Sequence, residues 1–177
     1  MSKEVAAVLE IEIRPLEPSD VEVVVGIAIA AWQPVFAGYR QAMGDELFVT
    51  VHPHWQREKA RQIREACAPD GSAIGAVAEV PEGDGQIARV VGFVTCYVVR
   101  PSRGIGEIGN NAVHPSWQGR GIAPRLYEYA FERLRERGMR YVKVHTGGDP
   151  AHAPARRAYQ KAGFDVVLPQ VEYYREL

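Results

Sequence analysis

The chain has 177 residues, of which 46% are hydrophobic, and its formal net charge is −1. This length and composition fit one globular domain with a buried core, and we expect a single domain over 1–177 with residues 1–9 as a poorly ordered extension. The near-neutral, mixed charge gives no reason to expect nucleic acid or a membrane surface as partner. Cys67 and Cys96 are predicted to be free thiols in a reducing cytoplasm. We find no signal peptide and no run of about 18 apolar residues, so we expect a cytoplasmic protein.

The first third of the chain predicts one strand followed by two helices. Glu10–Arg14 alternates apolar and charged residues, which is typical of a strand. Ser19 is placed to cap a helix over the apolar run Val21–Trp32. Gln33–Pro53 is expected to be irregular, and a further helix is predicted over His54–Ala68.

A run of three strands is expected next. Ala73–Val80 and Ala88–Val99 are rich in β-branched residues, and the turn Gly83–Asp84–Gly85 between them predicts a hairpin. Glu107–Val113 is the third strand, and His114–Pro115 ends it.

The last third predicts two helices and further strands. The apolar stripe of Arg120–Arg137 makes it the clearest helix in the sequence. A strand over Tyr141–Thr146, a helix over Ala153–Ala162 and a terminal strand pair over Phe164–Leu168 and Val171–Tyr174 follow. This order of elements indicates an α/β fold whose sheet has antiparallel and parallel parts.

A glycine-punctuated loop precedes the clearest helix. Gly119 and Gly121 lie between the strand that ends at Val113 and the helix from Arg120 onward. Free N–H groups at the positive end of a helix dipole bind phosphate or pyrophosphate, and glycine lets such a ligand approach the backbone. The glycines alone are equally compatible with a tight turn that needs positive φ.

Two other phosphate-binding motifs are disfavoured. Gly104–Gly109 matches the dinucleotide fingerprint G-x-G-x-x-G, but that motif belongs in a turn that opens a helix. Here the segment runs on into Asn110–Val113 and Pro115, so a dinucleotide-dependent oxidoreductase is a minor alternative. A Walker loop needs Lys followed by Ser or Thr, and Gln118–Ala123 has neither.

Two motifs in the C-terminal half resemble the GNAT superfamily of N-acetyltransferases. Gln118–Ala123 is similar to the signature Gln/Arg-x-x-Gly-x-Gly/Ala, and Tyr159–Phe164 is similar to Tyr-x-Lys-x-Gly-Phe. One helix and one strand separate them, as in the family. The resemblance implies the GNAT fold, which is a mixed, mostly antiparallel twisted sheet of six to seven strands with a splayed strand pair and about four flanking helices.

The resemblance also implies an acetyl-CoA site. The pyrophosphate would lie on the N–H groups of the glycine loop, and the pantetheine arm would lie between the splayed strands and pair with Val113 like an added strand. His152 stands where many members have Asn, and Pro124 removes one N–H from the loop. The residues implied to bind the cofactor are Ala112, Val113, Gln118, Gly119, Arg120, Gly121, Ile122, Ala123 and His152.

Direct transfer of the acetyl group to an amine needs a base, an oxyanion donor and an acid. The resemblance suggests Glu107 as base, the backbone N–H of Asn111, close before an expected bulge, as oxyanion donor, and Tyr159 as acid. A solvated strand-edge glutamate and a core tyrosine are the plain alternatives for two of them. The pair His52 and His54 lacks further ligands at a sensible spacing, so no metal is expected.

The acceptor is expected to be a small-molecule amine whose identity the sequence does not reveal. In the family the first two helices and the last strands form the acceptor site, which here would contain Trp32, Phe36, Tyr39 and Tyr173, with Trp55 and Tyr174 nearby. Aromatic rings suit a cation with an apolar part. The same rings would also fit the core or the interface of a homodimer. An alternative function is a catalytically idle CoA-binding module that acts as a sensor or assembly domain.

Overall fold

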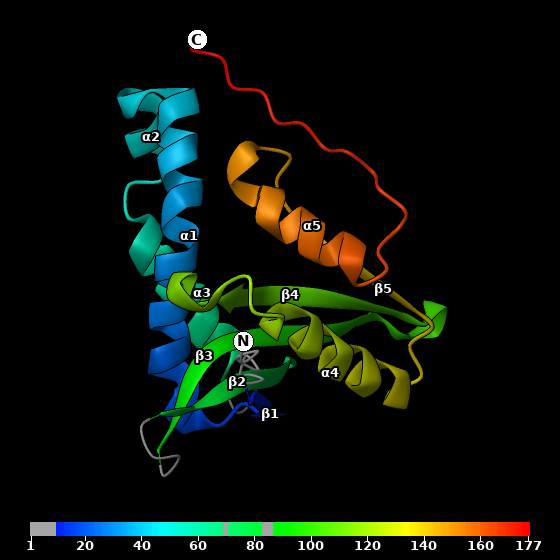
Figure 1. The fold of residues 1–177 in the computed structure, drawn as a ribbon. Helices are drawn as coiled ribbons and strands as arrows, with labels where there is room; N and C mark the ends of the chain where they lie inside the picture. Colours follow the sequence, from blue (N-terminus) through cyan, green and yellow to red (C-terminus); the bar gives the residue numbers. More distant parts are fainter. Residues whose placement is uncertain (1–9, 69–70, 83–86) are drawn as a thin grey trace, which may run out of the picture.

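The computed structural model describes residues 10–68, 71–82 and 87–177 (Figure 1). The expected N-terminal extension over 1–9 and the hairpin turn Gly83–Gly85 lie outside these residues. The described chain has five α-helices and five strands, besides short 3-10 turns, in the order β1 (Glu12–Pro15), α1 (Val21–Met43), α2 (Asp45–Val51), α3 (Trp55–Ala66), β2 (Ile74–Glu82), β3 (Ile87–Arg100), β4 (Ile105–Val113), α4 (Ile122–Glu136), β5 (Tyr141–Val144) and α5 (Ala153–Lys161).

The five strands form one mixed sheet in the order β1-β2-β3-β4-β5. Neighbouring strands are antiparallel, except that β4 and β5 run parallel. The mixed, mostly antiparallel sheet is therefore confirmed, with fewer strands in the described residues than the six to seven expected.

The predicted terminal strand pair is wrong. Neither Phe164–Leu168 nor Val171–Tyr174 is a strand, and Val166 and Leu168 are 82% and 85% exposed. Gly163 has a φ of 91° at the end of α5, and beyond it the terminal segment runs past α5 towards the α2 end of the molecule, away from β5 (Figure 1). An alternating pattern forms a strand only where another strand accepts its hydrogen bonds.

The expectation of an irregular segment over residues 33–53 is also wrong. The first helix continues through Pro34 to Met43, and the short helix α2 follows. Proline removes one hydrogen bond from a helix interior. Tertiary packing nevertheless retains the helix here, because Val35 is buried and Phe36 stacks on Trp55 of α3 with ring centroids 4.3 Å apart. Gly44, at a φ of 78°, separates α1 from α2.

Helices cover both faces of the sheet (Figure 1). α1 and α3 pack on one face, where Phe93 of β3 and Val24 of α1 are fully buried. On the other face α4 buries Leu126, Tyr127 and Leu134 against the strands, which confirms its predicted apolar stripe.

The segment Pro18–Met43 is long and apolar enough to cross a bilayer by length and composition, with a mean hydropathy of 1.6. This differs from the expectation that the chain has no such run. Val24, Ile27 and Ala28 in this segment are buried in the core between the helices and the sheet. The apolar composition of Pro18–Met43 is thus explained by the burial of part of this segment in the protein core.

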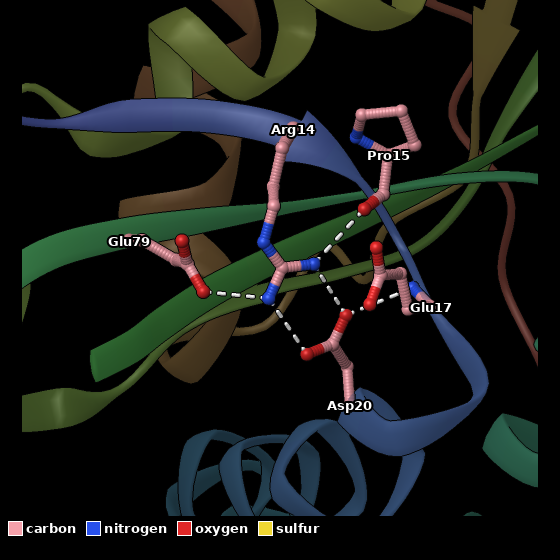
Figure 2. Close-up of polar contacts among 5 residues, drawn as sticks. All are labelled: Arg14, Pro15, Glu17, Asp20 and Glu79. Carbon is pink, nitrogen blue, oxygen red and sulfur yellow. Dashed lines mark hydrogen bonds and ion pairs between the residues drawn. The ribbon is translucent and has the colours of Figure 1, made fainter. Parts of the chain in front are cut away.

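A partly buried ion-pair network connects β1 to the start of α1 (Figure 2). The Arg14 guanidinium donates to both carboxylate oxygens of Asp20, at 2.7 and 2.8 Å, and to Glu79 Oε1 on β2 at 2.6 Å. Asp20 also accepts the backbone N–H of Glu17 at 2.8 Å. The network holds the first helix at the edge of the sheet.

Candidate functional site

The C-terminal half of β4 has a free edge on its β5 side. β5 pairs with β4 only from Ile105 to Ile108, with Ile108 opposite Val144. Within the described residues, Asn111–Val113 is paired on one side only, with β3, and Gly109 and Asn110 have no register partner on either side. The two strands therefore part after Ile108, and the expected splayed pair is present.

A β-bulge lies where the strands part. Val94 of β3 is opposite Asn111 and Cys96 is opposite Ile108, so Gly109 and Asn110 together face the single residue Thr95. Thr95, which is fully buried, donates its hydroxyl to the Asn110 carbonyl at 3.1 Å. A Cβ on Gly109 would collide with the Tyr97 ring and lie 2.8 Å from Thr95 Oγ1. The bulge thus precedes Asn111, which corrects the expectation that Asn111 lies just before it.

The register decides which backbone groups of β4 face the gap. The His114 N–H bonds to the Val91 carbonyl at 2.8 Å, and hydrogen-bonded pairs alternate along antiparallel strands. Ala112 is therefore bonded to β3, whereas the backbone polar groups of Asn111 and Val113 point away from β3, towards the gap. These are the orientations that the predicted roles of the Asn111 N–H as oxyanion donor and of Val113 as a pairing partner would require.

The glycine loop joins this free edge to the start of α4. Gly119 and Gly121 both have a φ of 77°, and a Cβ on either would meet no atom within 4 Å. Gly121 is the N-cap of α4, and the first N–H groups of a helix have no intrahelical partner. The positive φ confirms that the turn needs glycine, while the open backbone leaves room for a ligand, so phosphate binding here stays a prediction.

The side chains of the other predicted cofactor residues make contacts within the protein. Ile122 is 2% exposed and Ala123 packs against the core. Gln118 donates its amide to the Val113 carbonyl at 3.1 Å, which fixes the loop on the end of β4 and occupies that carbonyl. The Arg120 guanidinium lies 4.6 Å from the Trp117 ring centroid and donates to the Ser116 carbonyl. Ala112 packs on the opposite face, against the α1 and α3 cluster.

A polar cluster at the gap joins β4, α4 and α5. The Asn111 amide nitrogen donates to the Gly109 carbonyl and to the Tyr159 hydroxyl, both at 3.1 Å, and Tyr127 donates its hydroxyl to Asn111 Oδ1 at 2.9 Å. Tyr127 and Tyr159 are 3% and 7% exposed, and burial raises the pKa of both phenols. The side chains of Asn111 and Tyr159 are thus brought together, and Tyr127 is a partner that the sequence did not reveal.

Glu107 lies on the other face of β4, opposite Tyr97 of β3 and Lys143 of β5. Its carboxylate is 2.9 Å from the Lys143 ammonium and 3.4 Å from His145 Nδ1, and its side chain is 24% exposed. Glu107 is therefore a carboxylate in an ion pair near the gap, and it is more enclosed than a solvated strand-edge glutamate.

His152 is held by a short turn before α5. Its Nδ1 lies 2.5 Å from Asp149 Oδ2, while Asp149 Oδ1 accepts the N–H groups of Ala151 and His152. A Cβ on Gly147 would collide with the Asp149 carboxylate and the His152 ring. Asp149 therefore caps this turn and also holds the His152 ring, so only the Nε2 edge of His152 could reach a cofactor.

The predicted acceptor residues are divided between two places. Phe36 and Tyr39 pack edge to face at 5.7 Å, and both also pack against His52, at 5.3 and 5.8 Å. Trp32, one turn earlier, lies under the Lys59 ammonium at 4.4 Å. These rings therefore take part in packing between helices. Tyr173 is 88% exposed in the terminal segment and joins no such cluster.

A hollow of about 350 Å³ opens beside Tyr97, the register partner of Glu107. Its lining has polar and apolar surface in about equal parts. It comes from α3, the segment before β2, β3 and the bulge: Gln62, Glu65, Ala66, Ser72, Tyr97 and Asn110.

Other chemistry finds little support in the described residues. No group of three or more potential metal-binding side chains occurs there. Cys67 and Cys96 are free, and burial raises the pKa of each thiol to about 11, which keeps both protonated at neutral pH. The dinucleotide-like segment Gly104–Gly109 runs into β4, and Asn110 lies within this strand. The oxidoreductase alternative required a helix that begins near Asn110, so this prediction is wrong.

Comparison with known proteins agrees with this geometry. Residues 40–164 match the family described as "Acetyltransferase (GNAT) family". The chain is 32% identical over 133 residues to the mycothiol acetyltransferase of Saccharomonospora viridis, which is 69% of this chain and 40% of that protein. It is 36% identical over 101 residues to the mycothiol acetyltransferase of Tsukamurella paurometabola, which is 57% of this chain and 33% of that protein. The matches thus span two fifths or less of these relatives.

Solved structures have the same fold. A PaiA N-acetyltransferase from Thermoplasma acidophilum in complex with coenzyme A gives a TM-score of 0.65 at 18% identity, covering 90% of this chain and 92% of that one. The aminoglycoside N-acetyltransferase AAC(6')-Iy in complex with CoA gives 0.60 at 19% identity, with 95% of both chains covered. With 125 of its 177 residues matched by the family description, this chain belongs to the GNAT acetyltransferase family.

Proposed function

We propose that this protein is an acetyl-CoA-dependent N-acetyltransferase that passes the acetyl group directly to a primary amine of a small molecule within a ternary complex. The observation that carries the proposal is the free edge of β4 from Gly109 to Val113, continuous with the open glycine loop at the start of α4. Membership of the family and the two relatives named as acetyltransferases support it.

Acetyl-CoA would lie along this edge and this loop. Its pyrophosphate would accept hydrogen bonds from backbone N–H groups of the loop from Gly119 to Ala123, where the helix dipole favours negative charge. Its pantetheine amides would pair with the gap-facing backbone of β4, as an added strand does. Because Gln118 already occupies the Val113 carbonyl, we expect the Val113 N–H to take the larger part in this pairing.

The residues around the gap can supply the three catalytic functions. Glu107 would accept the proton that the amine loses, directly or through water, and the gap-facing N–H of Asn111 would stabilise the oxyanion. Tyr159 would donate a proton to the departing thiolate, and burial raises the pKa of Tyr159 and so keeps the phenol protonated. Two bound substrates in contact need no enzyme nucleophile, and both thiols stay protonated.

The hollow beside Tyr97 is a better candidate site for the acceptor than the rings of Phe36 and Tyr39 on α1. The hollow adjoins the register partner of Glu107, whereas Phe36 and Tyr39 are engaged in ring contacts with one another and with His52. Tyr39 of the expected acceptor set also lies 6.2 Å from the ring of His152, a predicted cofactor residue.

The test is turnover of acetyl-CoA by the purified protein with a panel of primary amines, followed through release of the CoA thiol. We expect acetylation of at least one amine, with a Michaelis complex that contains both substrates and therefore intersecting initial-rate lines. Binding of acetyl-CoA without turnover on any amine would refute the proposal and favour the catalytically idle module.

A further inference from the structure

We propose that Tyr127 is a positioning residue for acetyl transfer: by donating its hydroxyl proton to Asn111, it keeps the proton of Tyr159 free for the departing thiolate. This inference rests on the proposed function and deepens it. Tyr127 lies on α4 and the two others lie on β4 and α5, so three elements meet in one cluster.

The Gly109 carbonyl determines the orientation of the Asn111 amide. A carbonyl can only accept, so the group 3.1 Å from it must be the Asn111 amide nitrogen. The second hydrogen of that nitrogen points to the Tyr159 hydroxyl, also at 3.1 Å. Asn111 Oδ1 therefore faces Tyr127, whose hydroxyl donates to it at 2.9 Å.

This arrangement leaves the Tyr159 proton without a short hydrogen bond to Asn111, and the neighbouring Tyr127 hydroxyl acts towards Tyr159 as a donor. The Tyr159 oxygen accepts from Asn111, and its distance to Asn111 Oδ1 is 3.4 Å, beyond the usual range for a hydroxyl donor. Without the Tyr127 hydroxyl, Oδ1 would be an unsatisfied buried acceptor 3.4 Å from Tyr159. The Tyr159 hydroxyl would then turn its proton to Oδ1, because an unsatisfied buried polar group is costly.

The reaction step shows why the direction of this proton matters. The amine nitrogen forms a bond to the acetyl carbon, and the carbon–sulfur bond breaks with its electron pair remaining on sulfur. Tyr159 gives its proton to that sulfur, and the proton lost by nitrogen goes to Glu107. Glu107 then releases its proton to water and the Tyr159 phenolate regains one from water, so the products are the amide and the CoA thiol. A Tyr159 proton bonded to Asn111 Oδ1 cannot take this path.

The experiment compares Tyr127→Phe with Tyr129→Phe on the same helix. Tyr127→Phe removes one oxygen and keeps the buried ring, whereas the Tyr129 ring packs beside Arg133, 5.2 Å from its guanidinium, outside the Asn111 cluster. Each variant is assayed with acetyl-CoA and with 4-nitrophenyl thioacetate, whose more acidic thiol leaves without needing a proton. Thermal unfolding confirms that each variant is folded.

We expect Tyr127→Phe to lower kcat with acetyl-CoA by roughly 10- to 100-fold. This loss is smaller than that from removing a general acid, because Tyr159 keeps its hydroxyl in the variant. The KM for acetyl-CoA should change little, and the loss with the aryl thioester should be much smaller. Tyr159→Phe should show the same pattern, and the double variant should be no slower than Tyr159→Phe alone. Tyr129→Phe should match the wild type.

Two results would overturn the inference. One is an equal loss with both thioesters, and the other is an additive effect of the two substitutions, since each indicates a general structural role for Tyr127. Failure of the wild type to acetylate any amine is a distinct result, because it refutes the proposed function and with it this inference.

Discussion

Replacing Arg14 by Met would leave two carboxylates of the Figure 2 network without their cation. The side chains of Asp20 and Glu79 are only 8% and 14% exposed, so water can replace the guanidinium only in part. Removing one partner from a buried ion pair costs about 3–5 kcal/mol. Because the Arg14 side chain is 25% exposed, we expect a loss of unfolding free energy at the lower end of this range, about 3 kcal/mol.

This loss is measurable as a fall in Tm of about 6–12 °C, since about 1 kcal/mol corresponds to about 2–4 °C in a chain of this size. Arg64→Met is the matched control, because Arg64 also binds a carboxylate through two nitrogens, that of Glu22, on an exposed surface. Exposed pairs contribute little, so its Tm should stay almost unchanged. Equal losses for Arg14→Met and Arg64→Met would refute the reasoning that burial decides the effect.

The same network predicts how acid affects stability. Hydrogen bonds from Arg14 hold the pKa of Asp20 below its usual value, against the opposing effect of burial. A carboxylate with a lowered pKa in the folded state stabilises the fold above its unfolded pKa of about 3.9, and this contribution is lost as the pH falls through the folded value. The difference in unfolding free energy between wild type and Arg14→Met should therefore shrink below about pH 4. A difference that stays constant down to pH 2 would contradict this.

Three further substitutions test the site. Gly121→Glu should abolish binding of acetyl-CoA in a calorimetric titration, because it places a strained residue and a negative charge at the expected phosphate position; unchanged affinity would remove the loop from the site. Glu107→Gln should lower kcat at neutral pH by roughly 10²-fold or more while leaving the affinity for CoA intact, and normal turnover would exclude Glu107 as the base. Gly109→Ala should destabilise the fold by about 1–3 kcal/mol in urea unfolding, through collision with Tyr97 at the bulge. Gly26→Ala on α1 is its control, since a Cβ there meets nothing within 4 Å, and the same loss in both would contradict the argument.

Much of the second half of the fold could be predicted from the sequence because its signals are local. Each of these signals lies within a single helix, turn or strand: the apolar stripe of α4, the glycines before it and the strand that leads to Val113. The length of α1 could not be predicted in the same way. Pro34 argues locally for a break, and the stacking of Phe36 on Trp55 that opposes it depends on a helix 19 residues away in the sequence.

The candidate site shows the same division. The backbone features around Gly119 and Gly121 follow from short motifs, whereas the side-chain partners come from distant strands and helices. Tyr127 is 16 residues from Asn111, and Tyr159 is 48 residues from it. The one available signal for Tyr127 was that a tyrosine on a buried helix stripe needs a hydrogen-bond partner. That signal does not identify the partner.

The central claim is that the free edge of β4 and the glycine loop bind acetyl-CoA. The most direct measurement is calorimetric titration of the purified protein with acetyl-CoA, CoA and NAD in parallel, with Gly121→Glu as control. We predict saturable binding of acetyl-CoA and CoA by the wild type, no heat with NAD, and no binding of acetyl-CoA by the variant. No binding of acetyl-CoA by the folded wild type, or equal binding by Gly121→Glu, would contradict the claim.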